Sequence, residues 1–271
     1  MEVGPIISAT AVVKTYRTRE VVVEALNNVD FEVMPGEMVA VMGPSGSGKT
    51  TLLNCMSGLD SIDSGDVSIA GRLLRTMSDD ALSDYRATSM GFVFQAYNLL
   101  PVLSAQENVE LPLVLAGASP NVARARAIEK LELVSLEDRL DHLPAELSGG
   151  QQQRVAIARA LANDPAIVWG DELTGNLDST SSAEIMELLT TLNKEQGQTF
   201  VIVTHSEEVG ALADRIVRMN DGMIVDDGNG SRGDVSSASA GPSGASTGAG
   251  SRGDVSSASA GPSGTSAGAG E

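Results

Sequence analysis

The sequence has few of the residues that build metal centres and disulfides, and its apolar residues form no long run. Its 271 residues include one cysteine and two histidines, too few for a disulfide, a zinc site or a catalytic-thiol cluster. No run of 18 apolar residues occurs, and the first residues lack the basic and apolar regions of a secretory leader. We therefore expect no direct membrane insertion and no export, with Cys55 buried and kept in a reducing compartment.

Positive charge and aromatic residues are also scarce. The chain carries 18 basic against 36 acidic residues, a net charge of −18, and only 3% aromatic residues. Nucleic acid is therefore not expected as a partner. A lysine-poor, acidic composition suits a protein dissolved in concentrated salt, so a halophilic source is one hypothesis. An ordinary acidic cytosolic protein is the alternative.

The composition changes abruptly after about residue 228. Residues 231–250 and 251–270 are two copies of one Gly/Ser/Ala-rich segment that differ at two positions, Ala245/Thr265 and Thr247/Ala267. Such a segment buries too little apolar surface to offset its ordering entropy, so residues 229–271 are predicted to be a disordered tail. Each copy contains an Arg-Gly-Asp triplet, which resembles an adhesion motif, but a duplicated linker is the simpler interpretation.

Residues 43–50 form a glycine-rich turn between an apolar run at 38–42 and a helical pattern that starts near Lys49. In such a turn backbone N–H groups point at an anion, the lysine reaches the β- and γ-phosphates, and the threonine hydroxyl can ligate Mg²⁺. The helix N-terminus adds its dipole. A glycine-rich linker is the alternative. The residues predicted to hold a nucleotide here are Gly43, Pro44, Ser45, Gly46, Ser47, Gly48, Lys49, Thr50 and Thr51.

A second helix N-terminus is predicted after residue 147, where a serine cap and two glycines precede helical spacing. Two helix N-termini cannot easily bracket one phosphate within a small domain, so this one is expected to serve a nucleotide held by another copy. Alone, the turn would be an ordinary loop. Its candidate residues are Ser148, Gly149, Gly150 and Gln151.

Two further apolar runs end in polar residues that can carry chemistry. Asp171 and Glu172 follow the run at 166–170, and His205 follows the run at 200–204. Because the ends of parallel strands meet at one edge of a sheet, these side chains are expected at the phosphate site. Neighbouring carboxylates at a solvated strand end are the alternative for the first pair.

Taken together, these segments resemble the ATP-binding cassette (ABC) ATPases over about residues 5 to 226. Residues 91–101, 107–113 and 174–178 resemble the branch that powers lipoprotein release and macrolide export. The resemblance implies an α/β fold: a P-loop NTPase cassette with a RecA-like parallel-sheet core, an antiparallel β subdomain and an inserted helical subdomain. The chain pattern agrees, with alternating runs at 5–14, 21–33 and 66–70 and apolar strands near 37–42, 91–94, 166–170 and 199–204.

The resemblance also implies roles for single residues, with ATP and Mg²⁺ as cofactors. The catalytic residues would be Glu172 as general base, His205 as the switch histidine, Gln95 and Lys49. Mg²⁺ would be held by Thr50, Gln95 and, through water, Asp171. Tyr16 would stack on adenine, or else be a strand-edge residue. Asp178 would cross to the partner's phosphate loop, or cap the helix that follows, and both can hold.

Two positions depart from the family pattern. Gly170 and Leu173 stand where the branch usually has alanine and proline. Neither position supplies chemistry, so catalysis is not in question. Without proline the backbone after Glu172 is expected to be less rigid.

The resemblance implies partners as well. Two cassettes, expected as a homodimer with ATP, would face head to tail. They would drive a separately encoded transmembrane permease from the inner face of the cell membrane. The chain would therefore be cytoplasmic and peripheral. Residues 1–228 would form the ATPase domain, with a helical subdomain at about 96–160 that meets the permease. The apolar residues 111–115 could join that contact, but burial within the subdomain is the favoured expectation.

Two other functions remain open. A soluble ABC ATPase of DNA repair or translation would typically carry a second cassette or a long coiled coil, and the sequence has neither. A regulatory module that binds ATP without turnover predicts loss of Glu172 or His205, and both are present.

Overall fold

The computed structural model describes residues 4–17 and 21–228, which include two β-sheets and seven α-helices. The predicted tail at 229–271 lies outside the described residues. None of the helices in the described part combines the length and the apolar character that crossing a membrane requires.

One sheet is antiparallel and has four strands in the order β2-β1-β4-β5. Its side chains alternate between a buried and an exposed face, as a sheet covered on one side requires. The strands are β1 (Ile7–Arg17), β2 (Val22–Val33), β4 (Ser64–Ile69) and β5 (Arg72–Leu73). The predicted alternating runs therefore form the antiparallel layer, and the prediction is confirmed.

The other sheet has six strands in the order β10-β9-β3-β8-β7-β6 and is parallel except for β10. β3 and β8 are buried along their whole length, which explains why they contain only apolar residues or threonine. The strands are β3 (Met38–Met42), β6 (Met90–Phe94), β7 (Ile167–Asp171), β8 (Thr199–Val203), β9 (Arg215–Asn220) and β10 (Met223–Asp226). The predicted parallel core is confirmed; the β9–β10 hairpin was not predicted.

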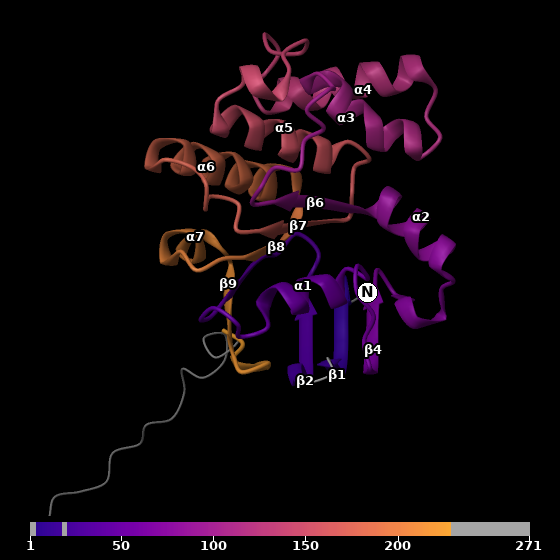
Figure 1. Ribbon diagram of the computed structural model, residues 1–271, viewed down its shortest axis with the longest axis vertical. Helices are drawn as coiled ribbons and strands as arrows, with labels where there is room; N and C mark the ends of the chain where they lie inside the picture. Colours follow the sequence, from indigo (N-terminus) through magenta and orange to yellow (C-terminus); the bar gives the residue numbers. More distant parts are fainter. Residues whose placement is uncertain (1–3, 18–20, 229–271) are drawn as a thin grey trace, which may run out of the picture. The chain divides into compact units, whose positions relative to one another are not determined.

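The helices are α1 (Lys49–Met56), α2 (Asp79–Ser89), α3 (Ala105–Leu115), α4 (Pro120–Leu133), α5 (Gly149–Leu161), α6 (Ser179–Gln196) and α7 (Glu207–Leu212). Figure 1 shows α3, α4 and α5 packed together at one end of the domain, while α1 lies between the antiparallel strands and the parallel sheet. Two short 3₁₀ turns occur at Leu74–Thr76 and Pro144–Glu146. The helical pattern expected after Gln95 is present; α2 was not predicted.

Two hydrophobic clusters form the core. One lies between the antiparallel sheet, α1 and the parallel strands, and contains Cys55, which is 2% exposed as predicted. Burial raises the pKa of this thiol to about 11. The other lies between the opposite face of the parallel sheet and the helices α3, α4, α5, α6 and α7.

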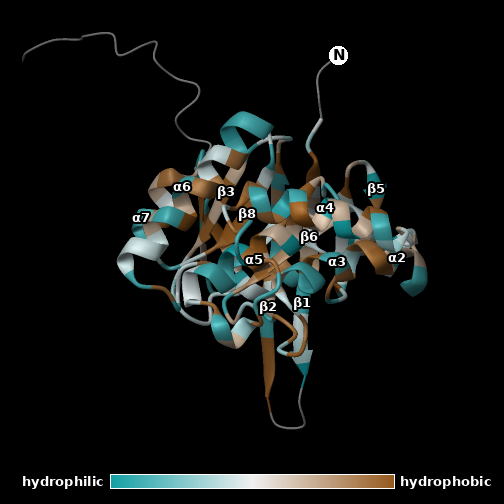
Figure 2. Ribbon diagram, turned by 90° about the horizontal axis from the view of Figure 1, so that it is seen from above, coloured by the Kyte–Doolittle hydropathy of each residue, from teal (hydrophilic) through white to brown (hydrophobic). Residues whose placement is uncertain are grey.

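The apolar run at 111–115 is divided between core and surface. Leu113 is buried at 1% exposure, whereas Val114 and Leu115 are 47% and 74% exposed. The expectation of burial is therefore right for Leu113 and wrong for the last two residues, because α3 presents them to its outer face. A second exposed apolar stretch starts β2, where Val22 and Val23 are 60% and 51% exposed. Figure 2 shows part of β2 in brown, the colour of hydrophobic residues.

Candidate active site

A cavity of about 450 Å³ opens at the carboxyl edge of the parallel sheet, beside the antiparallel layer. Ligands of α/β proteins bind at this edge because strand ends and helix N-termini converge there. It is lined by Tyr16, Val23, Ala25, Gly43, Ser45, Gly46, Gly48, Lys49, Thr50, Thr51, Glu172, Val203 and His205. The structure thus brings most of the predicted nucleotide-binding residues to one cavity, together with Tyr16, Glu172 and His205.

The turn after β3 needs glycine for its shape. Gly43, Gly46 and Gly48 have φ of +155°, +80° and +101°, which other residues rarely adopt. A Cβ at Gly43 would lie 2.2 Å from the Met219 carbonyl oxygen, and one at Gly48 would lie 2.4 Å from that of Ala25. The loop is therefore held close to neighbouring backbone.

Lys49 is the first residue of α1, and its side chain folds back over the turn. Its Nζ donates to the carbonyl oxygens of Gly43 at 2.8 Å and Pro44 at 2.9 Å. The ammonium group lies within a cavity whose other side carries Glu172 and His205. An anionic group that enters the turn would meet this charge and the positive end of α1.

Asp171 ends β7 and lies against the start of α1. Burial and the negative charge of Glu172 raise the pKa of Asp171, while Lys49 and a hydrogen bond with Thr50 act in the opposite direction. Asp171 and Thr50 therefore offer two oxygen ligands at one point, which is the donor type that Mg²⁺ prefers.

Glu172 follows β7 in a left-handed conformation, with φ of +51°. Its N–H donates to the Val203 carbonyl oxygen at 2.9 Å, and its Oε1 lies 2.8 Å from His205 Nδ1. The left-handed residue turns the chain away from the strand while the carboxylate faces the cavity. The carboxylate can accept a proton there, and the histidine holds it in place.

Gln95 and Asp178 do not line the cavity. Gln95 follows β6, and its side chain packs on Gly175, where a Cβ would lie 2.7 Å from Gln95 Nε2. The backbone carbonyl oxygen of Gln95 accepts from the Asn176 side chain at 2.8 Å. Asp178 caps α6 by accepting from the Ser181 N–H at 3.0 Å. The predicted capping role of Asp178 is confirmed.

Residues 148–151 also lie outside the cavity. Ser148 caps α5 in a capping box with Gln151, as the sequence predicts. A Cβ at Gly150 would lie 3.0 Å from Ser181 Oγ, which donates to Asp178 at 2.7 Å. The structure thus places this helix N-terminus beside Asp178, away from the phosphate turn of its own chain.

Asp60 is a site residue that was not predicted from the sequence. Tyr16 donates its hydroxyl to Asp60 Oδ2 at 2.7 Å, and buried Lys14 donates to Asp60 Oδ1 at 2.8 Å, with Nζ 5.0 Å from the Tyr16 ring centroid. Burial acts to raise the pKa of Asp60, but these hydrogen bonds lower it below its usual value. No local pattern links residues 44 positions apart. This network holds the Tyr16 ring at the cavity rim.

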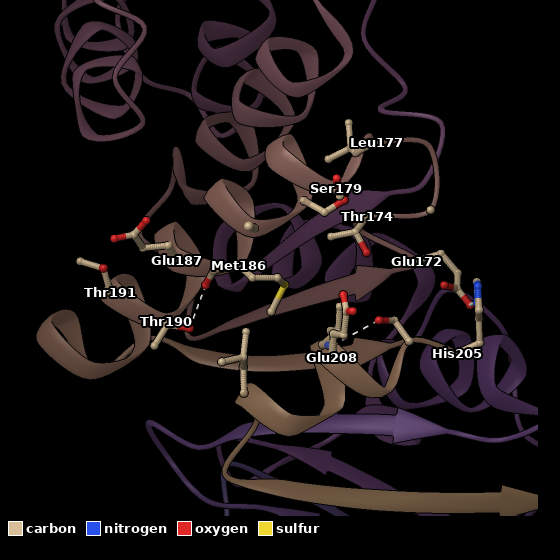
Figure 3. A pocket seen from close by; sticks show the side chains of 16 residues that line it. Glu172, Thr174, Leu177, Ser179, Met186, Glu187, Thr190, Thr191, His205 and Glu208 are labelled. Carbon is tan, nitrogen blue, oxygen red and sulfur yellow. Dashed lines mark hydrogen bonds and ion pairs between the residues drawn. The ribbon is translucent and has the colours of Figure 1, made fainter.

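A larger cavity, of about 790 Å³, lies next to the first, between α6 and α7. Glu172 and His205 stand at one end of it, and Met186, Thr190 and Glu187 of α6 lie along its length (Figure 3). The two catalytic candidates therefore separate the two cavities.

The comparisons with known proteins agree with this geometry. The family model described as ABC transporter matches residues 26–175. An uncharacterized ABC transporter ATP-binding protein of Thermotoga maritima is 54% identical over 78% of this chain and 90% of its own length. The macrolide export ATP-binding/permease protein MacB of Marinobacter nauticus is 45% identical over 84% of this chain, which spans only 35% of that relative.

Solved structures show the same fold. A dimeric structure of MJ0796, described as a bacterial ABC transporter cassette, has a TM-score of 0.75 and 46% identity, over 81% of this chain and 97% of that chain. A dimeric post-hydrolysis state of MJ0796, bound to ADP and Pi, has a TM-score of 0.75 and 45% identity. MJ0796 comes from Methanocaldococcus jannaschii. The match of sequence and fold shows that this chain belongs to the ABC transporter family, as an ATP-hydrolysing ATP-binding cassette.

Proposed function

We propose that the chain is the motor subunit of a membrane transporter in the lipoprotein-release and macrolide-export branch. The observation that carries the proposal is the cavity where the glycine turn, Lys49, Glu172 and His205 meet at one sheet edge. A soluble ATPase would use the same cavity, but the named relatives are ABC transporter and macrolide export proteins.

ATP would enter with its phosphates in the turn at residues 43–51. Lys49 would exchange the carbonyl oxygens of Gly43 and Pro44 for phosphate oxygens, which are the stronger acceptors for an ammonium group. Tyr16 would stack on the adenine, since its ring stands at the rim of the same cavity.

The residues present fit a magnesium ion. Burial and the negative charge of the adjacent Glu172 raise the pKa of Asp171, and the Thr50 side chain forms a hydrogen bond with this carboxylate. Thr50, Asp171 through water and, with nucleotide bound, Gln95 would hold the ion, which would supply positive charge beside the phosphates.

Hydrolysis would depend on positioning and charge, since phosphoryl transfer gives protein groups little covalent chemistry to perform. Glu172 accepts a proton from the attacking water. His205, 2.8 Å from that carboxylate, fixes its orientation and can donate toward the γ-phosphate.

Each chain would supply only half of a complete site. Ser148, Gly149, Gly150, Gln151 and Asp178 are collected on one surface but do not line the chain's own cavity. In a head-to-tail pair they would face the ATP of the partner copy, and release of the products would let the copies separate.

The membrane partner would contact the helical part of the cassette. A groove of about 410 Å³ lies where this helical part meets the rest of the domain, and its lining includes Pro112 of α3 and Arg159 of α5 on one side and Phe92 of β6 and Arg86 of α2 on the other. We propose residues 1–228 as the ATPase domain, 96–160 as the helical part that meets the partner, and 229–271 as the tail. The chain would then be a peripheral protein on the inner face of the membrane.

The acidic composition remains the basis of a proposal about the source. With 36 acidic and 18 basic residues, the folded chain would repel itself at low salt and be stabilised by screening. Folding that requires molar KCl would support a halophilic source. Full stability without salt would refute it.

The first test of the proposed function is light scattering of the Glu172→Gln variant at high KCl, with and without ATP. Removing the base should trap an ATP-dependent dimer, and adding Lys49→Ala should abolish it. A monomer under all conditions, together with no ATPase activity of the unmodified chain, would contradict the proposed motor.

A further inference from the structure

The loop after Glu172 is fixed by a contact between two positions that depart from the family pattern. Leu173 is 3% exposed, and its side chain fills the notch beside Gly170, where a Cβ would lie 2.9 Å from Leu173 Cγ and Cδ1. Any larger residue at 170 would displace Leu173. Gly170 and Leu173 are thus a matched pair on either side of the carboxylates Asp171 and Glu172.

A buried glutamine holds the same loop from the other side. Gln153, on the second turn of α5, is 0% exposed and donates through Nε2 to the Leu173 carbonyl oxygen at 2.9 Å. Its Oε1 has no hydrogen-bond partner among the described residues. The hydrogen bond of this fully buried amide therefore joins α5 to the loop after Glu172.

The position of Gln153 links two functional segments. Its helix begins at Ser148, Gly149 and Gly150, and its side chain reaches the residue that directly follows Glu172. A leucine at 173 leaves its own φ free, where a proline would fix it. The hydrogen bond from Gln153 supplies that restraint.

We propose that Gln153 is a positioning residue that fixes Glu172 of its own chain through the Leu173 backbone. It thereby couples α5, whose N-terminus faces the partner's ATP, to the base that acts on the chain's own ATP. The inference rests on the proposed function. It makes hydrolysis at one site depend on a contact made at the other.

The basic test is Gln153→Met in the full chain, with Gln152→Met as the matched control. Methionine has a similar shape but cannot donate, and it also removes the unpaired Oε1. We expect kcat to fall about tenfold, because a small displacement of the base slows the reaction, with KM for ATP within about twofold. The melting temperature should change little. Gln152 donates to the Leu147 carbonyl oxygen at 3.0 Å and does not touch the loop, so its variant should keep kcat.

Mixed dimers decide whether Gln153 acts on its own chain. Dimers with two affinity tags are isolated with ATP in the absence of Mg²⁺, and a single turnover is started by adding Mg²⁺. In the first dimer, one chain carries Glu172→Gln and the other carries Gln153→Met. In the second dimer, both changes lie on one chain and the other chain is unmodified.

We expect the first dimer to be slowed about tenfold, because its remaining base lies beside the altered residue. The second dimer should match a dimer with Glu172→Gln alone. Slowing of only the second dimer, of both equally, or of neither would overturn the inference. If the Glu172→Gln mixed dimer itself hydrolyses no ATP, the proposed function fails instead.

Discussion

The two glycine-rich turns of the chain use glycine for different reasons. In the turn at residues 43–48 the glycines have positive φ values, and a Cβ at Gly43 or Gly48 would lie 2.2 Å or 2.4 Å from a backbone carbonyl oxygen. Gly149 and Gly150 lie within the first turn of α5 and only approach side chains, the Tyr97 and Ser181 hydroxyls. The backbone of the chain itself shapes the first turn, whereas the second is packed against side chains and, in the proposed dimer, would face the nucleotide of the partner copy.

The largest expected effect is on ATP affinity, which a substitution in the first turn should lower and one in the second turn should not. Gly48→Ala places a Cβ 2.4 Å from a carbonyl oxygen at a φ of +101°. The clash should lower ATP affinity by more than about 100-fold, measured by titration with a fluorescent ATP analogue. Gly150→Ala should keep the affinity of the single chain. Equal losses would show that the turns do not differ as described.

A smaller effect is expected from the cap of the second turn. Ser148→Ala removes the side chain that caps α5, which should weaken the ATP-dependent dimer of the Glu172→Gln variant about tenfold. The measurement is light scattering across a range of protein concentrations. Ser119→Ala is the control, because Ser119 precedes α4 without a side-chain cap bond. An unchanged dimer would mean that the capped end is not part of the interface.

The contact between Gly170 and Leu173, on either side of the two carboxylates, can be tested by a double-mutant cycle. Gly170→Ala should destabilise the chain by about 1–3 kcal/mol because of the crowded Leu173, and Leu173→Ala by about 2–5 kcal/mol because of the cavity left. The double variant should lose less than the sum, since the alanine methyl occupies part of that space. Urea unfolding measures all three. Strict additivity would show that the two residues do not share one space.

The smallest effect concerns the network at the cavity rim. The hydrogen bonds of Asp60 lower its pKa on folding, although burial opposes them. Its contribution to stability is therefore complete above the unfolded pKa of about 3.9 and is lost as the pH falls through the lower folded value. Asp60→Asn should flatten the loss of stability below about pH 4, measured by urea unfolding between pH 5 and pH 2. An unchanged slope would contradict this assignment.

The sequence predicted the features that local patterns encode. Residue type and spacing predict the phosphate turn, the serine cap of α5 and the Asp178 cap of α6. They also predict β7, which ends at Asp171, and β8, which ends at Val203, two residues before His205. Each depends on contacts within a few residues, where sequence order fixes geometry.

Contacts between distant segments could not be predicted. Gln153 reads as an ordinary helix residue until the loop after Glu172 is seen against it, 20 positions away. Gly170 and Leu173 were noticed as departures, but their contact depends on the left-handed turn at Glu172. Asp60 reaches Tyr16 because the chain after α1 returns to the end of β1, where Asp63 also accepts from the Thr15 N–H. Such pairings follow from tertiary packing, which local propensity does not encode.

The single thiol at Cys55 makes the chain a reporter of its own motion. It lies on the helix that begins at Lys49 and is 2% exposed, with its pKa raised to about 11. A thiol reagent can therefore react only when this part of the core opens. The labelling rate of Cys55 thus reports how often α1 opens. A slower labelling rate in the presence of ATP would measure how much the nucleotide stabilises α1. No engineered cysteine is needed for this measurement. Surface positions can equally be given a reactive cysteine while the native one stays silent.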